Sequence, residues 1–304
     1  MKLLPVFGIG ALRIGQSTIN KQTSKYMQGN LSYFRYGLYF ESLAALFSLF
    51  YLIFAGVSGW NLPTFLCAIA TGVCFLAELL TSLKALQSAP LPLCTLCSLG
   101  GGIILPAIFG IFFFNEPMSL YQWLGVALFF LSVYFLMPKT EHKIKMEGKT
   151  IFILLCNFCI NGACGFIGKY FAVNVQNGNA ALFAFLCYAF ASLCFAISLL
   201  IFKIKSVTNT QNTQTQTLPK GTKFLEKPLY FYGIAVGAVC ATIVYFSTVL
   251  SRVIPIIILN TLPNSICLVG TLFLGLWIFK EKLTFLKVVG VILSAISTTI
   301  IILF

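Results

Sequence analysis

The chain alternates between long apolar stretches and short polar joints, and this pattern predicts ten helices. The apolar spans cover residues 3–24, 31–56, 62–87, 91–114, 118–137, 149–173, 180–202, 229–252, 256–279 and 283–304. An α-helix needs about 20 residues to cross the hydrocarbon core of a bilayer, and these spans have about that length. Because most joints are short, consecutive helices are expected to lie antiparallel in one compact bundle.

The two halves of this pattern resemble each other. Spans 91–114 and 118–137 are joined by Asn115-Glu116-Pro117, and spans 256–279 and 283–304 by Lys280-Glu281-Lys282. A shift of 165 positions aligns Phe114 with Phe279, Glu116 with Glu281, Gly125 with Gly290, Val126 with Val291, Leu128 with Leu293 and Ser132 with Ser297. We interpret this as an internal duplication, with repeats at 1–137 and 149–304 and a charged linker at 138–148.

Each repeat has five helices, which is an odd number, so successive repeats would enter the membrane in opposite directions. The predicted fold class is therefore an all-α membrane protein whose ten transmembrane helices form two inverted five-helix repeats. Many secondary transporters are built in this way, with the substrate bound between the repeats near the bilayer midplane.

Composition agrees with a multi-pass protein of the cell membrane. Hydrophobic residues make up 59% of the 304 positions and charged residues only 9%, whereas soluble domains carry about 25% charged residues. The net charge of +13 comes largely from lysines in two loops, where anionic lipid headgroups are sufficient partners. We therefore expect membrane lipids, and no nucleic acid, as partners.

Eleven cysteines are scattered through the apolar spans, and the single histidine, His142, lies in the charged linker. Disulfide frameworks and zinc sites require clustered ligands. We expect the cysteines to serve as small packing residues, and we expect no metal and no other cofactor.

Lysine and arginine gather in alternate joints, around Lys25, Lys139–Lys149, Lys203–Lys227 and Lys280. The positive-inside rule would place these joints in the cytoplasm and both termini outside.

Several short motifs resemble the EamA-like carriers of the drug/metabolite transporter superfamily. They are Asn20-Lys21 at the end of the first span, Gly168-Lys169 near the end of the sixth, and the joint from Phe114 to Gly125. The resemblance implies ten helices, a central cavity and secondary transport of a small metabolite, such as an amino acid, a sugar, a nucleotide sugar or a drug. It also implies that both termini lie in the cytoplasm, contrary to the charge rule.

Polar residues inside apolar spans are the candidate substrate-binding residues, because a polar side chain facing lipid is costly. Arg13, Gln16, Ser17 and Asn20 follow one another at helical spacing and share one face of the first helix. Pairs four residues apart occur in the sixth and ninth spans: Asn157 with Asn161, and Asn260 with Asn264. These residues could line a cavity or could form hydrogen bonds between helices.

Glu41 and Glu78 complete the candidate set. A carboxylate at the centre of a membrane helix costs about 2.5–3.5 kcal/mol on insertion scales. Three explanations remain open: pairing with Arg13, a proton-coupling role, or a position near a helix end from which the side chain reaches water.

The joint residues are expected to have structural roles. Glu116 and Glu281 are predicted to cap the helices that they begin. Lys21 and Lys169 are predicted to reach the headgroup region, or else to gate substrate. Gly100-Gly101-Gly102 with Pro106, and Pro263 with Asn264, either bend their helices at a site or allow close helix packing.

The function expected from these patterns is alternating-access transport of a small polar or amphipathic solute across the cell membrane. Proton coupling through a glutamate is one of the open options. No G-x-x-x-x-G-K-[ST] motif is present, so the chain itself is not expected to hydrolyse ATP. The alternatives are a lipid-linked-sugar flippase or membrane scaffold, and an intramembrane enzyme using Glu41 and Glu78 as acid and base. The enzyme has little support, because no nucleophile constellation accompanies the glutamates.

Overall fold

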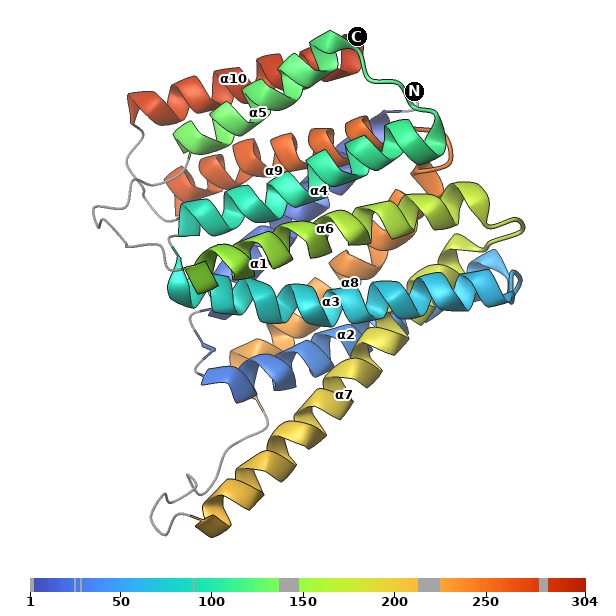
Figure 1. The fold of residues 1–304 in the computed structure, drawn as a ribbon, viewed down its shortest axis with the longest axis vertical. Helices are drawn as coiled ribbons and strands as arrows, with labels where there is room; N and C mark the ends of the chain where they lie inside the picture. Colours follow the sequence, from blue (N-terminus) through green and yellow to red (C-terminus); the bar gives the residue numbers. More distant parts are fainter. Residues whose placement is uncertain are drawn as a thin grey trace. The chain divides into compact units, whose positions relative to one another are not determined.

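A computed structural model describes residues 3–24, 26–27, 29–89, 91–136, 148–212, 225–278 and 284–304. Within these ranges the chain forms ten α-helices and no strand (Figure 1). They are α1 (Leu4–Ser24), α2 (Gly29–Ala55), α3 (Leu62–Ser88), α4 (Leu91–Phe114), α5 (Leu120–Leu136), α6 (Gly148–Asn174), α7 (Ala180–Asn212), α8 (Lys227–Leu250), α9 (Ile256–Ile278) and α10 (Phe285–Leu303).

The ten helices confirm the ten predicted elements, and the largest difference in bounds is in α7. This helix continues beyond its predicted end at residue 202 to Asn212. Of the predicted linker 138–148, only Gly148 is described, and it begins α6. The rest of that linker, including His142, lies outside the described residues.

Among the described residues, seven helices are long and apolar enough to cross a membrane, which indicates a membrane protein. The candidate spans are Leu31–Ala55, Leu62–Ser82, Cys97–Phe114, Gly148–Asn174, Ala180–Phe202, Lys227–Leu250 and Phe285–Leu303. Two further apolar stretches, Leu120–Leu136 and Ile256–Gly270, are shorter. The polar residues of α1 keep that helix outside the set.

The helices group into two compact units. The first unit comprises Met1–Ser17, Ala77–Gln176 and Phe246–Phe304, and the second comprises Thr18–Leu76 and Asn177–Tyr245. The first unit contains all of α4, α5, α6, α9 and α10, and the second contains α2 and α7; α1, α3 and α8 contribute to both. Each unit therefore draws helices from both halves of the sequence.

In the second unit, α2 packs along α7. Glycines mark the closest approaches: Gly37 of α2 lies against Phe195 of α7, and Gly72 of α3 lies against the backbone of α7 at Ala191. Small residues let the backbones of apolar helices approach closely, which provides van der Waals packing where the surrounding medium is itself apolar.

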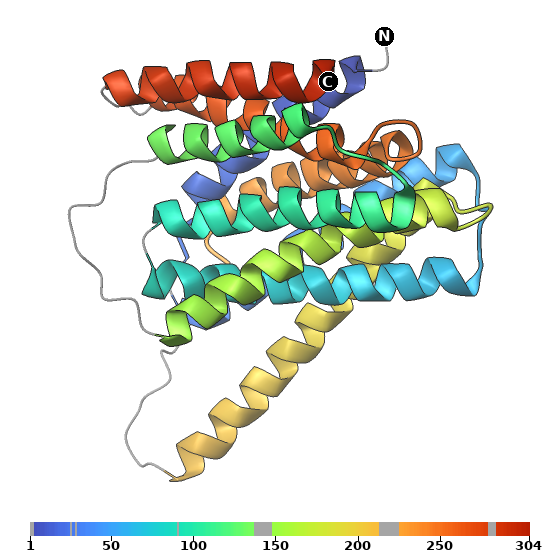
Figure 2. The ribbon, with the colours of Figure 1, turned by 45° about the horizontal axis from the view of Figure 1, so that its top comes forward.

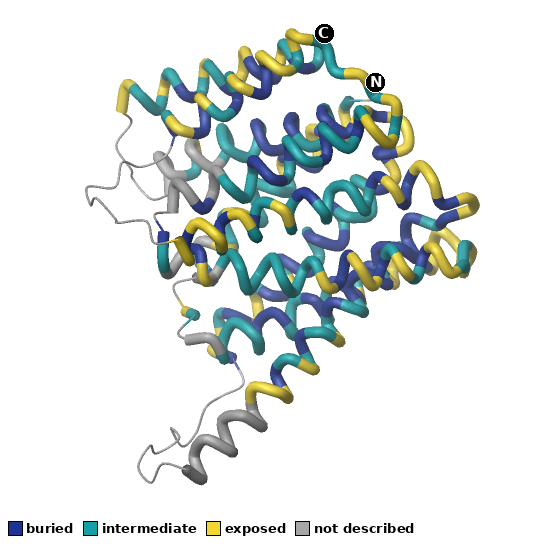
Figure 3. The backbone as a smooth tube through the Cα atoms, viewed as in Figure 1, coloured by how far each residue is buried: buried dark blue, intermediate teal, exposed yellow. Residues whose placement is uncertain are grey.

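The core of the first unit is an apolar cluster from four helices. Ile103 of α4, Phe129 and Val133 of α5, Ile257 of α9 and Ile301 of α10 are buried together. Figure 3 shows buried and exposed residues alternating around α5 and α10. The exposed positions are themselves mostly apolar, as expected for surfaces that face lipid.

Helices α5 and α10 make a reciprocal contact, and they lie side by side in Figures 1 and 2. Gly125 of α5 lies against Ser297 and Ile301 of α10. Gly290, which the shift of 165 positions aligns with Gly125, lies against Ser132 and Leu136 of α5, which the same shift aligns with Ser297 and Ile301. Residue numbers rise along one helix as they fall along the other, so the two equivalent helices pack antiparallel.

Helices α4 and α6 cross where glycine allows close contact. A Cβ on Gly101 would overlap the carbonyl oxygen of Phe158, and one on Gly162 would overlap the side chain of Leu105. Helix α4 is continuous through Pro106. Of the two explanations for the Gly100–Gly102 run, these contacts support close helix packing.

Helices α1 and α9 cross in an equivalent way. Gly10 lies against Ile266, and Gly270 lies against Ile14. Alignment of Lys21 with Lys169 relates α1 to α6, and the shift of 165 positions relates α4 to α9. Under these alignments Gly10/Ile266 corresponds to Phe158/Gly101, and Ile14/Gly270 corresponds to Gly162/Leu105. In each corresponding pair of contacts the glycine is on the other partner.

Candidate functional site

The joint between α4 and α5 is shaped by its own sequence. Asn115 has a left-handed backbone (φ 50°), and the Glu116 N–H donates to the Gly110 carbonyl at 3.1 Å. Asparagine tolerates this conformation at the end of a helix, and a following proline cannot continue the helix. These features end α4 and project Glu116 away from its axis.

Helix α5 has its own cap. The Gln122 N–H donates to Ser119 Oγ at 3.1 Å, and the Ser119 N–H donates to Gln122 Oε1 at 3.1 Å. This reciprocal pair is a capping box. The N-terminus of α5 is thus satisfied without Glu116.

Glu116 instead caps another helix. Its Oε2 accepts a hydrogen bond from the Ile256 N–H, the first amide of α9, at 2.9 Å. Glu116 was predicted to cap α5, the helix that follows it, and this is wrong. Ser119 and Gln122 cap α5, and Glu116 caps α9. The same prediction for Glu281 lies outside the described residues.

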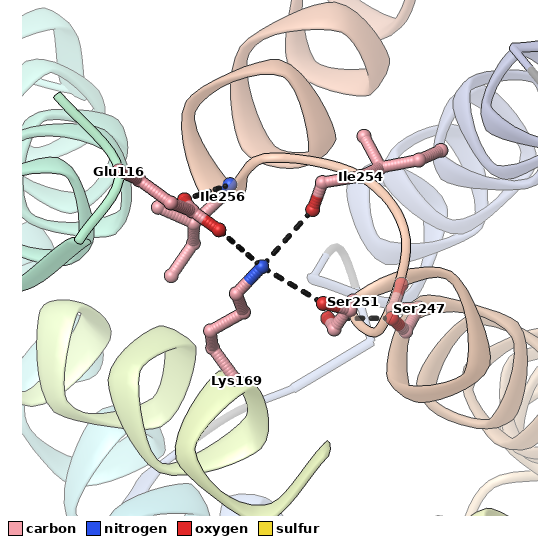
Figure 4. A network of polar contacts seen from close by, with 6 residues as sticks. All are labelled: Glu116, Lys169, Ser247, Ser251, Ile254 and Ile256. Atoms are coloured by element: carbon pink, nitrogen blue, oxygen red, sulfur yellow. Dashed lines mark hydrogen bonds and ion pairs between the residues drawn. The ribbon is translucent and has the colours of Figure 1, made fainter. Parts of the chain in front are cut away.

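Lys169 is buried, and it pairs with Glu116 (Figure 4). Its side chain is 4% exposed, and Nζ lies 2.6 Å from Glu116 Oε1. Nζ also donates to the carbonyls of Ser251 at 2.8 Å and Ile254 at 3.1 Å. All three ammonium hydrogens thus have acceptors, as a buried ammonium requires. The prediction that Lys169 reaches the headgroup region is wrong, because these partners hold it inside the first unit; no side chain is described for Lys21.

The Lys169–Glu116 pair lies at the junction of two helix ends. Carbonyls just beyond α8 face the ammonium, and the first N–H of α9 faces the carboxylate. Cations are favourable near the C-terminus of a helix and anions near the N-terminus. Both charges therefore match the dipoles beside them.

Arg13 lies at a second polar cluster in the first unit. Its Nη1 donates to Asn264 Oδ1 of α9 at 2.5 Å, and its charge interacts electrostatically with Glu78 of α3. Ser17, one turn along α1, forms a side-chain hydrogen bond with Cys267, one turn along α9. Of the three explanations for Glu78, this arrangement favours pairing with Arg13.

Asn157 forms a third group with residues of α3. It is almost fully buried, and its Nδ2 donates to Ser82 Oγ at 2.8 Å and Thr81 Oγ1 at 3.2 Å. Asn161 donates to the Asn157 carbonyl at 3.0 Å. For Asn157, the interhelical hydrogen-bond explanation fits better than cavity lining. The sequence reasoning missed Thr81 and Ser82, although they lie three and four residues after Glu78 on its helical face.

Replacing Asn157 by alanine should lower the free energy of unfolding by about 1 kcal/mol, because interhelical hydrogen bonds in membranes are worth about 0.6 kcal/mol on average. Asn161→Ala is a suitable control, since the Asn161 amide donates to Asn157 of its own helix. Thermal unfolding of both variants in detergent checks the difference. Equal melting temperatures would contradict the proposed role of the Asn157 bonds.

The remaining candidates are Gln16, Asn20, Glu41 and Asn260. Asn260 of α9 is half-buried, with its amide nitrogen facing Gly165 of α6, and Gln16 is half-buried in α1. Asn20 and Glu41 belong to the second unit. Glu41 is 4% exposed and has an electrostatic interaction with Cys187. The explanation that the Glu41 side chain reaches water is therefore wrong.

No protein-family model and no curated protein matches the chain. A solved structure described only as "Crystal structure of protein" superposes with a TM-score of 0.69, covering 97% of this chain and 96% of the other at 15% identity. Identity this low shows a shared fold alone. In the part of the chain that the structure describes, the fold is all-α with ten helices, and seven of these are long and apolar enough to cross a membrane.

Proposed function

We propose that the chain is a secondary transporter of the cell membrane that moves a small polar or amphipathic solute by alternating access. The antiparallel reciprocal contact of α5 with α10 carries this proposal. When equivalent residues of two helices meet in this way, the helices are related by an approximate two-fold axis perpendicular to both. If they cross a membrane, that axis lies in the membrane plane, as in inverted-repeat carriers.

The exchanged glycine contacts add independent support. The crossing of α1 with α9 and that of α4 with α6 involve equivalent positions of the two repeats. Two different helix pairs therefore follow the same relation as α5 and α10. This relation favours ten transmembrane helices, five in the repeat at 1–137 and five in the repeat at 149–304.

The Arg13 cluster is the proposed contact for the solute. A guanidinium, a carboxylate and an amide from α1, α3 and α9 meet there, and charged groups in membrane helices usually serve substrates or coupling ions. Gln16 and Ser17 lie on α1 and Asn260 lies on α9, two of the helices that form the cluster, whereas Asn161 lies on α6. In this proposal Glu78 balances the charge of Arg13, the pairing that the site favours, and proton coupling through Glu78 is the alternative.

Purified protein screened by thermal shift against amino acids, sugars, nucleotide sugars and cationic drugs tests the proposal. A solute present at 100 times its Kd should stabilise the folded state by about 2.7 kcal/mol. A solute found in this way should also accumulate in proteoliposomes containing the protein. Four solute classes without any thermal shift, together with no uptake, would count against a carrier.

Arg13→Gln should weaken binding of such a solute by about tenfold or more, because hydrogen bonds to charged groups are worth about 1.5–3 kcal/mol. The matched control is Arg252→Gln, since Arg252 is exposed in the turn after α8. Titration of the thermal shift with each variant gives the two affinities. Unchanged affinity in Arg13→Gln would remove Arg13 from the site.

A further inference from the structure

The Lys169–Glu116 pair connects three segments of the first unit that are far apart in sequence. Lys169 belongs to α6, Glu116 to the joint between α4 and α5, and the remaining partners to the turn between α8 and α9. We call the pair and its main-chain partners at Ser251, Ile254 and Ile256 the latch (Figure 4). We infer that the latch is a gate: it is closed in this structure and opens during the conformational cycle. This inference rests on the proposed transport function.

The contacts of the latch are of a reversible kind. A buried ion pair usually adds little stability compared with apolar side chains of the same volume, so stability alone is weak grounds for one. Here the ammonium holds two main-chain carbonyls and the carboxylate holds one main-chain N–H. The segments are therefore joined by groups that water can satisfy equally well once they separate.

The pair also has a route for opening. The Lys169 side chain is 4% exposed, whereas that of Glu116 is 24% exposed. Glu116 is therefore the less enclosed partner of the pair, and separation can begin on its side. The turn keeps its own backbone bonds, including Ile254 N–H to the Leu250 carbonyl at 2.9 Å. It can therefore move away as an intact piece.

The latch holds the ends of helices that carry candidate solute residues. Asn260 and Asn264 lie one and two turns after Ile256 on α9, and Asn161 lies about two turns before Lys169 on α6. Release of the latch frees the N-terminal end of α9 from α6 and from the α4–α5 joint. A path would then open at the end of the helices next to these amides.

A cysteine at Ser251 reports the state of the latch. Ser251 is buried, and cysteine is close to serine in size. The protein is labelled in lipid nanodiscs with a membrane-impermeant maleimide and no added solute, and modification at position 251 is quantified by peptide mass spectrometry. The variants in this S251C background are Glu116→Gln and the double change Lys169→Met with Glu116→Gln. Lys149→Met is the control, because Lys149 is an exposed lysine on the same helix.

The cysteine at position 251 should be labelled at least about tenfold faster in Glu116→Gln, because removal of one charge leaves its partner buried without compensation. It should be labelled as fast in the double variant, because no ion pair remains to hold the latch closed. Glutamine can still accept from the Ile256 N–H, so the cap of α9 is retained. Lys149→Met should label at the background rate. The double variant keeps the test valid if the single variant folds poorly, because it leaves no unpaired charge.

The reference for global loosening is Cys187, which is fully buried in the second unit. Equal labelling of position 251 in all variants, or a rise matched by an equal rise at Cys187, would show that the latch is only structural and would overturn the gate. Because labelling needs no solute, the result is separate from the transport test. If position 251 opens but none of the four solute classes is transported, the reversible opening of the latch would be supported and the transport function would not.

Discussion

Replacing Lys169 by methionine should lower the free energy of unfolding by about 3–5 kcal/mol, the range measured when one partner of a buried ion pair is removed. The change leaves the Glu116 carboxylate without its cation and the carbonyls of Ser251 and Ile254 without their donor. Denaturant or thermal unfolding in a fixed detergent gives the difference. No other single substitution considered for this chain should cost more.

A second change separates the pairing from the volume of the side chain. When Glu116→Gln is added to Lys169→Met, much of the lost stability should return, because no unpaired charge remains buried. Lys149→Met should unfold like the unaltered protein. A double variant as unstable as Lys169→Met alone would mean that packing of the lysine stem, not its charge, stabilises this part of the fold.

Gly101→Ala should have the next largest effect, a loss of about 3 kcal/mol, at the upper end of the range for overpacked contacts. The added methyl group would meet the main-chain carbonyl of Phe158. A backbone atom cannot rotate away as a side chain can, so α4 and α6 must separate. Unfolding measured by intrinsic tryptophan fluorescence gives the loss.

The adjacent residue is a matched control for this prediction. A Cβ on Gly102 meets nothing within 4 Å, and alanine is the better helix former by about 1 kcal/mol. Gly102→Ala should therefore be neutral or stabilising. If Gly101→Ala and Gly102→Ala had the same stability, the close crossing of α4 and α6 would be in doubt.

The helices were predictable because their signal is local. Each apolar span is about as long as a membrane crossing, and the joint Asn115-Glu116-Pro117 marks a helix end by its residues alone. The equivalence of Gly125 with Gly290 was also visible in the sequence. What the sequence did not provide was the packing of α5 against α10, since an alignment says which residues correspond and not which residues touch.

The sequence predicted which residues belong to the candidate site, but not which of them are in contact. Arg13 and Asn264 were both singled out because polar residues are costly in apolar helices, yet they are separated by 251 positions and nothing local pairs them. Glu116 was assigned to the nearest helix N-terminus, whereas its partner, Ile256, lies 140 positions away. Thr81 and Ser82 went unnoticed because hydroxyl side chains commonly bond to their own helix.

The exchanged glycines bear on how the gene for this protein can change. Two copies of the first half, assembled as a homodimer, would bring Gly10 against Gly101 and leave a void. Two copies of the second half would force Phe158 against Ile266. Under the proposed duplication, neither half could therefore take the place of the other in such a dimer.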